Sequence, residues 1–198
     1  MDWIDNIPSA WTGHREFAKW LVKYLSPKLI VDLGVDQGYS SFVFADALQK
    51  NNIDGRVVGI DKFDADDTMS YLIRDTSEII KNYIKQNNIT NVDIIKECFH
   101  EVSLHWREPI QILHIDGLHT YEAVKEDFYD WKKFVDNNGV ILFHDVTAFS
   151  DTVGRFFKEI NDYGKKLFFT HSAGLGIWTK NNELYHKIIE MFPNVNQY

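Results

Sequence analysis

Two short stretches of the sequence carry the side chains best suited to chemistry. The first, IDGLHTYEA, places Asp116 just after an apolar run and His119 three positions later, and the second, GVILFHDV, ends in His144 and Asp145. Carboxylates and imidazoles bind divalent cations, so Asp116, His144 and Asp145 could hold an ion with positions open for substrate oxygens. Such an ion would lower the pKa of a bound hydroxyl, and His119, with an ordinary pKa of about 6.5, could remove its proton. The alternative for His119 is a helix-start residue that contacts only backbone.

A glycine turn after an earlier apolar run indicates a nucleotide-type cofactor site. The stretch LIVDLGVDQGYSSFVF predicts a buried strand over 29–33, a turn at Gly34 and Gly38, and a helix that Ser40 could cap. A dinucleotide-binding loop would read GxGxxG, but Asp36 stands where its second glycine should be. This spacing disfavours a nicotinamide dehydrogenase. The alternative is an ordinary strand–turn–helix junction.

The next two predicted strands end in residues that could contact an adenosine. RVVGID ends at Asp61, where a carboxylate can accept hydrogen bonds from both ribose hydroxyls. The alternative is a capping or turn aspartate, as its acidic neighbours Asp64, Asp66 and Asp67 could also be. VDIIKE leads to Cys98 and Phe99, and Phe99 could stack on an adenine ring or be a buried aromatic at a helix start.

The elements that must position these residues alternate between strand and helix. Strands are predicted over 29–33, 56–61, 92–96, 110–115 and 139–144, and helices over 14–25, 40–50, 68–88 and 120–135. After residue 145 the sequence predicts a helix over 151–163 and a hairpin made of LFFTH and GLGIWTK. The alternation implies an α/β fold with a parallel sheet covered on both faces, and ligands of such sheets bind at the carboxyl ends of the strands.

Composition limits the classes of protein. The 198 residues are 44% hydrophobic and 25% charged, which suits one globular domain over 1–198. The formal net charge of −8 argues against nucleic acid as a partner, because phosphate binding relies on Lys and Arg. The sequence predicts no membrane span and no secretory signal. A lone cysteine, Cys98, fits a reducing compartment, so a cytoplasmic location is expected.

The pattern D-x-G-x-x-x-G formed by Asp32, Gly34 and Gly38 resembles the first motif of class I S-adenosylmethionine (SAM) methyltransferases. This resemblance implies a Rossmann-like fold, with a mostly parallel seven-stranded sheet, a C-terminal antiparallel hairpin strand and helices on both faces. It also implies that Gly34 lets the amino-acid end of SAM approach the backbone, with Asp32 near the ammonium group. The cofactor-binding residues implied in this way are Asp32, Gly34, Gly38, Tyr39, Ser40, Asp61, Cys98, Phe99 and Asp116.

IDGLHTYEAVKEDFYDW followed by NNGVILFHDV is similar to the branch with macrocin-type sugar O-methyltransferases and cephalosporin-hydroxylase-like proteins, over roughly residues 28–146. Carried over, Asp116 and Asp145 become metal ligands, His144 a third ligand or neighbour, and His119 the general base. Several relatives place Asp or Glu where this chain has His144. Because Mg²⁺ prefers oxygen ligands, this departure weakens the case for magnesium, the expected ion. Residues 1–27 would form a helical lid, 28–146 the cofactor and metal core, and 147–198 a C-terminal helix and hairpin.

The expected function is SAM-dependent methylation of a hydroxyl on a sugar or glycan acceptor, assisted by a divalent metal. One alternative is a small phenolic or other hydroxylated metabolite as acceptor. Another, of a different class, is a non-catalytic SAM-binding partner or regulatory domain, which would not need Asp116, His119 and Asp145. The resemblance also suggests a homodimer, or attachment to glycosyltransferase modules.

Overall fold

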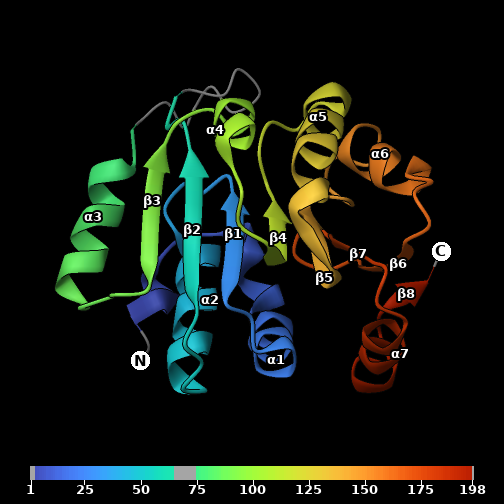
Figure 1. The fold of residues 1–198 in the computed structure, drawn as a ribbon, viewed down its shortest axis with the longest axis horizontal. Helices are drawn as coiled ribbons and strands as arrows, with labels where there is room; N and C mark the ends of the chain where they lie inside the picture. Colours follow the sequence, from blue (N-terminus) through green and yellow to red (C-terminus); the bar gives the residue numbers. More distant parts are fainter. Residues whose placement is uncertain (1–2, 65–74, 198) are drawn as a thin grey trace.

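The computed structural model describes residues 3–64 and 75–197, which contain an eight-stranded sheet in the order β3-β2-β1-β4-β5-β7-β6-β8 (Figure 1). The strands are β1 Leu29–Leu33, β2 Arg56–Asp61, β3 Val92–Lys96, β4 Ile110–Ile115, β5 Val135–His144, β6 Lys165–Phe169, β7 Leu175–Thr179 and β8 Asn196–Gln197. Strands β1 to β5 pair in parallel, whereas the β5–β7, β7–β6 and β6–β8 pairs are antiparallel. The expected mostly parallel sheet with antiparallel C-terminal strands is confirmed, with one strand more than the seven expected.

Two layers of helices cover the sheet. The helices are α1 Arg15–Leu25, α2 Tyr39–Lys50, α3 Ser77–Gln86, α4 Phe99–His105, α5 Tyr121–Trp131, α6 Val153–Glu159 and α7 Asn182–Met191. Because side chains alternate along a strand, Ile30 and Ile112 pack with α1, α2, α3 and α7, whereas Val31 and Leu113 pack with α4, α5 and α6. Burial on both faces explains why the central strands read as continuous apolar runs.

The N-terminal segment packs along the first of these layers. It consists of two short 3-10 helices, η1 Trp3–Asn6 and η2 Ala10–His14, followed by α1. The Trp3 ring contacts Phe42 of α2, and the Trp11 ring meets Phe44 of the same helix edge to face. Its predicted function as a lid over a ligand stays a prediction.

The structure departs from the predicted elements in a few places. The α-helix expected over 120–135 ends at Trp131, passes into a 3-10 turn, η4 Lys132–Phe134, and β5 begins at Val135 instead of residue 139. The register of β5 shifts at this point, since Val135 pairs with Ile110 but Val140 pairs with Ile112. The residues between these two pairs, Asp136 to Gly139, include the turn signal Asn-Asn-Gly, which was expected to end the preceding helix and instead marks an irregularity inside a strand.

The remaining differences concern helices. The described part of the helix expected over 68–88 is α3, and residues 68–74 lie outside the described residues, as do Asp66 and Asp67. Helix α6 is shorter than the predicted 151–163. Helices α4 and α7 were not among the predicted helices, and α4 has only seven residues, too few for a clear periodic pattern. Over the part of the chain that the structure describes, no helix combines the length and apolar character needed to cross a membrane.

Candidate active site

The carboxyl ends of β1, β4 and β5 meet at one edge of the sheet, which is where open α/β sheets bind ligands. The amide of Asp116, just after β4, donates to the Leu33 carbonyl at 2.8 Å, so the loop after β4 lies against the turn after β1. Gly34 permits this approach: its φ is 93°, and a Cβ there would lie 1.9 Å from the Asp116 carbonyl oxygen. The first glycine of the motif is therefore needed to bring two strand ends together, independently of any ligand.

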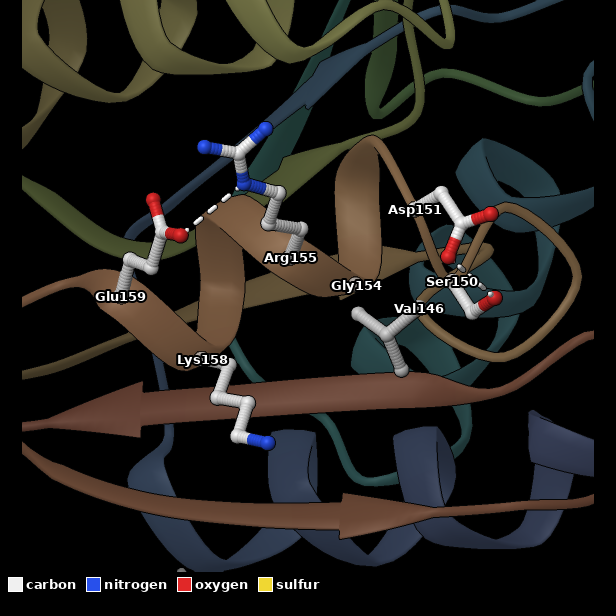
Figure 2. Close-up of a pocket in the computed structure, with 7 residues that line it drawn as sticks. All are labelled: Val146, Ser150, Asp151, Gly154, Arg155, Lys158 and Glu159. Atoms are coloured by element: carbon white, nitrogen blue, oxygen red, sulfur yellow. Dashed lines mark hydrogen bonds and ion pairs between the residues drawn. The ribbon is translucent and has the colours of Figure 1, made fainter.

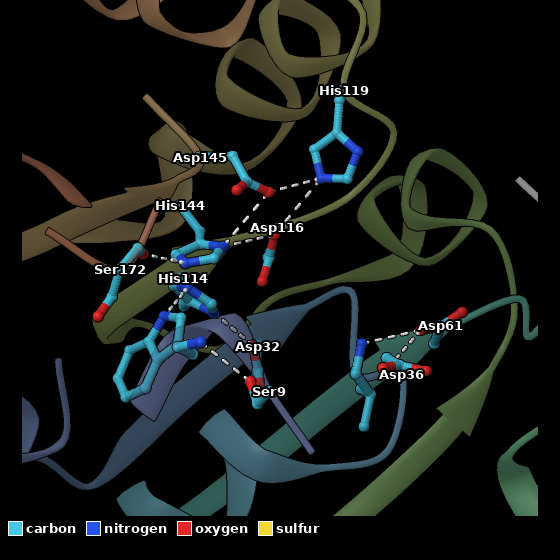
Figure 3. Close-up of polar contacts among 12 residues, drawn as sticks. Ser9, Asp32, Asp36, Asp61, His114, Asp116, His119, His144, Asp145 and Ser172 are labelled. Carbon is cyan, nitrogen blue, oxygen red and sulfur yellow. Dashed lines mark hydrogen bonds and ion pairs between the residues drawn. The ribbon is translucent and has the colours of Figure 1, made fainter. Parts of the chain in front are cut away.

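Asp116, His119, His144 and Asp145 form one cluster at this edge (Figure 3). His119 Nε2 lies 2.8 Å from Asp145 Oδ2 and 3.8 Å from Asp116 Oδ1. His144 Nδ1 lies 3.3 Å from Asp116 Oδ1 and 3.3 Å from Asp145 Oδ2. Asp145 has a left-handed backbone with φ of 64°, a strained conformation of the kind found at functional positions. The structure thus brings together the four residues singled out for metal and acid–base chemistry.

The charges in this cluster compensate one another. Burial opposes ionisation of both carboxyls, but His144 and the hydrogen bonds from the imidazoles hold the pKa of Asp116, and that of Asp145, below the ordinary value. Burial by itself would lower the pKa of each imidazole, yet the carboxylates raise it to about 9 for His119 and about 10 for His144. Both imidazoles therefore hold a proton at neutral pH, and the ordinary pKa expected for His119 is wrong. His119 can accept a proton only when the negative field of the carboxylates is offset.

Three of the four side chains fit a divalent cation. One possible ligand atom from each of Asp116, His144 and Asp145 lies within 4.8 Å of the others. His144 Nε2 donates to the Ser172 carbonyl at 3.1 Å, and this leaves Nδ1 facing the two carboxylates, as a histidine ligand oriented by backbone would be. Two carboxylates with one imidazole suit several divalent ions, whereas Mg²⁺ prefers oxygen alone. Binding would displace protons from the imidazoles, so affinity would rise with pH.

Asp32 lies in a closed hydrogen-bond network. Its carboxylate is completely buried and accepts bonds from Ser40 Oγ at 2.7 Å, Ser41 Oγ at 2.5 Å and His114 Nδ1 at 2.7 Å. His114 Nε2 in turn accepts a bond from Trp11 Nε1 at 3.0 Å, so this histidine is neutral and fully bonded. With no exposed surface, Asp32 differs from the expected direct neighbour of an ammonium group. We expect Asp32 to affect cofactor binding indirectly, through the Ser40, Ser41 and His114 side chains that it binds.

The residues after Gly38 also lie differently from the prediction. Helix α2 begins at Tyr39, and its N-cap residue is Gly38, which has φ of 88° and makes no side-chain capping bond. The prediction that Ser40 caps this helix is wrong, because its hydroxyl bonds to Asp32 inside the first turn. Tyr39 is buried, and its ring lies 6.5 Å from that of Trp11. Contact of the Tyr39 and Ser40 side chains with a cofactor stays a prediction.

Asp61 lies at the end of β2 beside the glycine turn, and its predicted contact with a ribose stays a prediction. Its Oδ2 accepts the amide N–H groups of Val35 at 2.8 Å and Asp36 at 3.0 Å, and its Oδ1 accepts that of Phe63 at 2.7 Å. A carboxylate offers about four acceptor positions and these three bonds use three of them, so one position remains for a hydroxyl. Asp61 therefore holds the turn in shape and still presents acceptor capacity at the edge.

Cys98 and Phe99 follow β3 at the same edge. Cys98 is the N-cap residue of α4 and Phe99 is its first residue, and both are partly exposed. The Phe99 ring packs on the backbone of Gly117, in the loop between Asp116 and His119. Phe99 thus lies at a helix start, as one of the two interpretations had it, but it is partly exposed and not buried. Stacking of its ring on an adenine stays a prediction.

Sequence reasoning missed the residues that hold the cluster from outside. The Phe149 ring stacks on His119, and the Ser172 carbonyl accepts hydrogen bonds from His144 and, at 3.0 Å, from Nε2 of the buried His14. Burial, and then the neighbouring His144, lower the pKa of His14 to about 3, so His14 is neutral. Ser172, Ala173 and Gly174 all have positive φ. The one available signal was the Ser-Ala-Gly turn of the predicted hairpin, and it says nothing about which carbonyl points inward.

A groove of about 900 Å³ begins at Val146, the residue after Asp145 (Figure 2). It is lined by Val146, Ser150, Asp151, Gly154, Arg155, Lys158 and Glu159. Glu159 accepts hydrogen bonds from Arg155 Nε at 2.9 Å and from the Tyr121 hydroxyl at 2.7 Å. Tyr121 begins α5 two residues after His119, so the groove borders both segments that carry the cluster.

A second histidine–carboxylate group lies between α4 and α5. His100 Nδ1 is 2.7 Å from Asp130 Oδ2 and 3.9 Å from Glu126 Oε1. The His100 side chain is 44% exposed, and such surface pairs contribute little to stability. His100 is therefore a histidine paired to carboxylates outside the buried cluster, and its substitution can serve as a control for substitutions within the cluster.

Comparison with known proteins agrees with this architecture. An uncharacterized protein of Sinorhizobium fredii is 28% identical over 177 residues, which cover 87% of this chain and 19% of the relative, so the chain spans about a fifth of its length. A Staphylococcus aureus protein described as a caffeoyl-CoA O-methyltransferase matches with a TM-score of 0.68 at 18% identity, covering 88% of this chain and 86% of that one. The O-methyltransferase TomG of Streptomyces achromogenes, which is involved in tomaymycin synthesis and was solved with SAM, matches with a TM-score of 0.62 at 17% identity over 86% of each chain.

The family match covers the part of the chain that builds the candidate site. A profile described as a methyltransferase domain matches residues 31–146, from inside β1 to the residue after Asp145. This span is more than half of the 198 residues and includes the glycine turn, Asp61 and the cluster. The chain belongs to this methyltransferase domain family.

Proposed function

We propose that the protein is a SAM-dependent O-methyltransferase that methylates a hydroxyl of a sugar or glycan with the help of a divalent cation. The observation that carries the proposal is the meeting of two half-sites at one sheet edge. The first is the glycine turn with Asp61, and the second is the cluster of Asp116, His119 and Asp145. The first suits an adenosine-containing methyl donor, and the second suits an acceptor hydroxyl that must lose its proton.

The donor half would bind SAM along the ends of β1, β2 and β3. Asp61 would accept a ribose hydroxyl, and Phe99 with Cys98 would lie beside the adenine. The turn at Gly34 and Gly38 would face the amino-acid end, with its shape set by the buried bonds of Asp32. Asp36, with φ of 44°, stands in the position of the glycine that a dinucleotide loop needs, which supports SAM over NAD.

The acceptor half would orient and deprotonate the hydroxyl. Methyl transfer breaks the sulfur–methyl bond, forms an oxygen–methyl bond and releases the hydroxyl proton, for which His119 Nε2 is the acceptor in this proposal. A cation held by Asp116, His144 and Asp145 would lower the pKa of the hydroxyl and offset the field that keeps His119 protonated. His144, bonded to the Ser172 carbonyl, would keep its Nδ1 turned toward the carboxylates.

Polar side chains in the groove beside Asp145 support a polyhydroxylated acceptor. Its Ser150, Asp151 and Lys158 side chains offer hydrogen-bond donors and acceptors of the kind that sugar hydroxyls need. A small phenolic acceptor is the second candidate, because Phe149 and the 44% exposed Leu118 place apolar surface beside His119. A homodimer, attachment to glycosyltransferase modules and a cytoplasmic location stay predictions from the sequence.

The first experiment tests the donor half by calorimetry. We expect SAM and S-adenosylhomocysteine to bind, and NAD and NADP not to bind, with Mg²⁺ or Mn²⁺ and with EDTA. Asp61→Asn should weaken the binding of SAM, because a ribose hydroxyl loses a charged acceptor. Failure of both SAM species to bind would overturn the proposal.

The second experiment tests catalysis with radiolabelled SAM and a panel of acceptors, namely methyl glycosides, nucleotide sugars and caffeic acid. His119→Ala and Asp145→Ala should lower kcat by about 100-fold or more while SAM affinity persists. His100→Ala, which removes a histidine paired to a carboxylate outside the cluster, should leave kcat unchanged. Full activity of His119→Ala would remove the base assignment, and turnover of caffeic acid alone would favour the phenolic candidate. Absence of turnover with all acceptors, despite SAM binding, would favour a non-catalytic SAM-binding module.

A further inference from the structure

His119 is held by an aromatic side chain as well as by carboxylates. The Phe149 and His119 rings are nearly parallel, with an interplanar angle of 5° and centroids 4.3 Å apart. The His119 side chain is only 12% exposed. One face of the imidazole is covered by the Phe149 ring, and its Nε2 lies 2.8 Å from Asp145 Oδ2. Of the ring pairs described around the cluster, this one is the closest to parallel.

The backbone of Phe149 is fixed on both sides. Its amide donates to the Asp145 carbonyl at 2.9 Å, and its carbonyl accepts the amides of Thr152 at 3.2 Å and Gly154 at 3.0 Å. The same loop is tied to the C-terminal hairpin, because the amides of Thr147 and Ala148 both donate to the Ala173 carbonyl. The loop that turns at Asp145 therefore returns Phe149 to a defined position over His119.

We propose that Phe149 is a positioning residue that fixes the plane of the His119 imidazole, so that Nε2 stays directed at the space between Asp116 and Asp145. The proposal rests on the proposed base function of His119. Stacking restricts rotation of the imidazole about its Cβ–Cγ bond. Because the nitrogen lone pair lies in the ring plane, fixing the plane also fixes the direction of the lone pair. Proton transfer requires that direction, because a base must lie in line with the proton that it removes. A single loop would thus place both Asp145 and the direction of the base.

The first test needs no substrate. In the metal-free, isotope-labelled protein, NMR should show His119 ring protons shifted upfield by the Phe149 ring current, with NOEs to Phe149 and to the Asp145 Hβ protons; His119→Gln identifies the signals. Phe149→Leu should remove the shift and weaken the NOEs to Asp145, because the imidazole is free to turn. Phe134→Leu, the same change at another partly buried phenylalanine, should leave both unchanged. An unshifted wild-type ring, or NOEs to Asp145 that persist in Phe149→Leu, would overturn the proposal.

The second test measures catalysis with whichever acceptor of the panel is turned over. Phe149→Leu should lower kcat by roughly 10- to 100-fold with KM for SAM unchanged, and Phe149→Tyr should stay near wild type because it keeps the flat face. In a His119→Gln background, Phe149→Leu should cause no further loss, since there is no base left to direct. An additive loss, or wild-type kcat in Phe149→Leu, would contradict the positioning function. If wild type turns over no acceptor, the proposed function fails and the NMR result alone decides whether Phe149 directs His119.

Discussion

At the scale of single residues, a buried carboxyl makes the stability of this protein depend on pH. Asp127 of α5 is 9% exposed, and burial, followed by the charges of Glu126 and Asp130, raises its pKa to about 8. The pKa of Asp127 in the folded state lies above its unfolded value of about 3.9. The stabilising contribution of this carboxyl is therefore complete below a pH of about 3.9 and is lost as the pH rises through 8. At neutral pH this group therefore lowers the free energy of unfolding.

We expect Asp127→Asn to raise the free energy of unfolding at pH 7 by roughly 1 to 2 kcal/mol, because the amide cannot ionise. The gain should shrink toward pH 4, where the carboxyl is protonated in the folded protein without penalty. Urea unfolding at both pH values measures it. Asp54→Asn, at a fully exposed carboxylate, is the matched control and should change little. An equal gain at both pH values would contradict the assignment.

The same scale shows what the sequence can and cannot reveal about the site. Asp116 and Asp145 were predictable neighbours, because adjacent parallel strands end at one edge and each aspartate follows a strand. The state of His119 was not predictable, because its raised pKa depends on a 2.8 Å contact with a residue 26 positions away. Ser40 was misread for a similar reason: its hydroxyl had two possible partners, and only the packing of β1 against α2 selects Asp32 over the backbone.

At the scale of elements, two of the three left-handed residues in the glycine turn, Gly34 and Asp36, should respond to substitution in opposite ways. Gly34→Ala places a Cβ 1.9 Å from the Asp116 carbonyl at φ of 93°, so either the turn or the end of β4 must move. We expect a loss of about 2 kcal/mol or more in the free energy of unfolding, with weaker SAM binding. Asp36→Gly, at φ of 44°, removes backbone strain and keeps the hydrogen bonds of its amide and carbonyl, so it should be tolerated. Thermal unfolding compares the two, and equal losses would contradict this view.

Elements were predicted best where one local signal was strong. Strands β1, β2, β3 and β4 have the bounds that the sequence predicts. Burial on both faces explains this for the central strands β1 and β4, whereas β3 lies at the edge of the sheet and only its Val92 is buried. The predicted start of β5 was wrong, because Val135 pairs with Ile110 through a shift in register that no local pattern reveals. β8, with two residues, is defined only by its pairing with β6.

At the scale of the whole molecule, the Trp11–His114 hydrogen bond joins residues 103 positions apart and ties the N-terminal segment to the centre of the sheet. Trp11→Phe should lower the free energy of unfolding by roughly 1 to 3 kcal/mol, because His114 Nε2 would lose its donor while buried. Trp3→Phe is the matched control: Trp3 is only partly buried and contributes ring contacts to Phe42 and Tyr83, so its loss should be smaller. Urea unfolding measures both, and indistinguishable losses would show that the hydrogen bond adds nothing beyond packing.

The carbonyl of Ser172 has a consequence for biosynthesis. It orients His144 and accepts a hydrogen bond from His14, which precedes it by 158 positions, so this part of the site closes only when both segments have been made. Contacts between such distant positions are slow to form, because a long loop must close before they add any stability. During synthesis the cofactor half, encoded first, can take shape while His144 still lacks the carbonyl that directs it. We therefore expect the nascent chain to acquire its ligand geometry last, after the hairpin has left the ribosome.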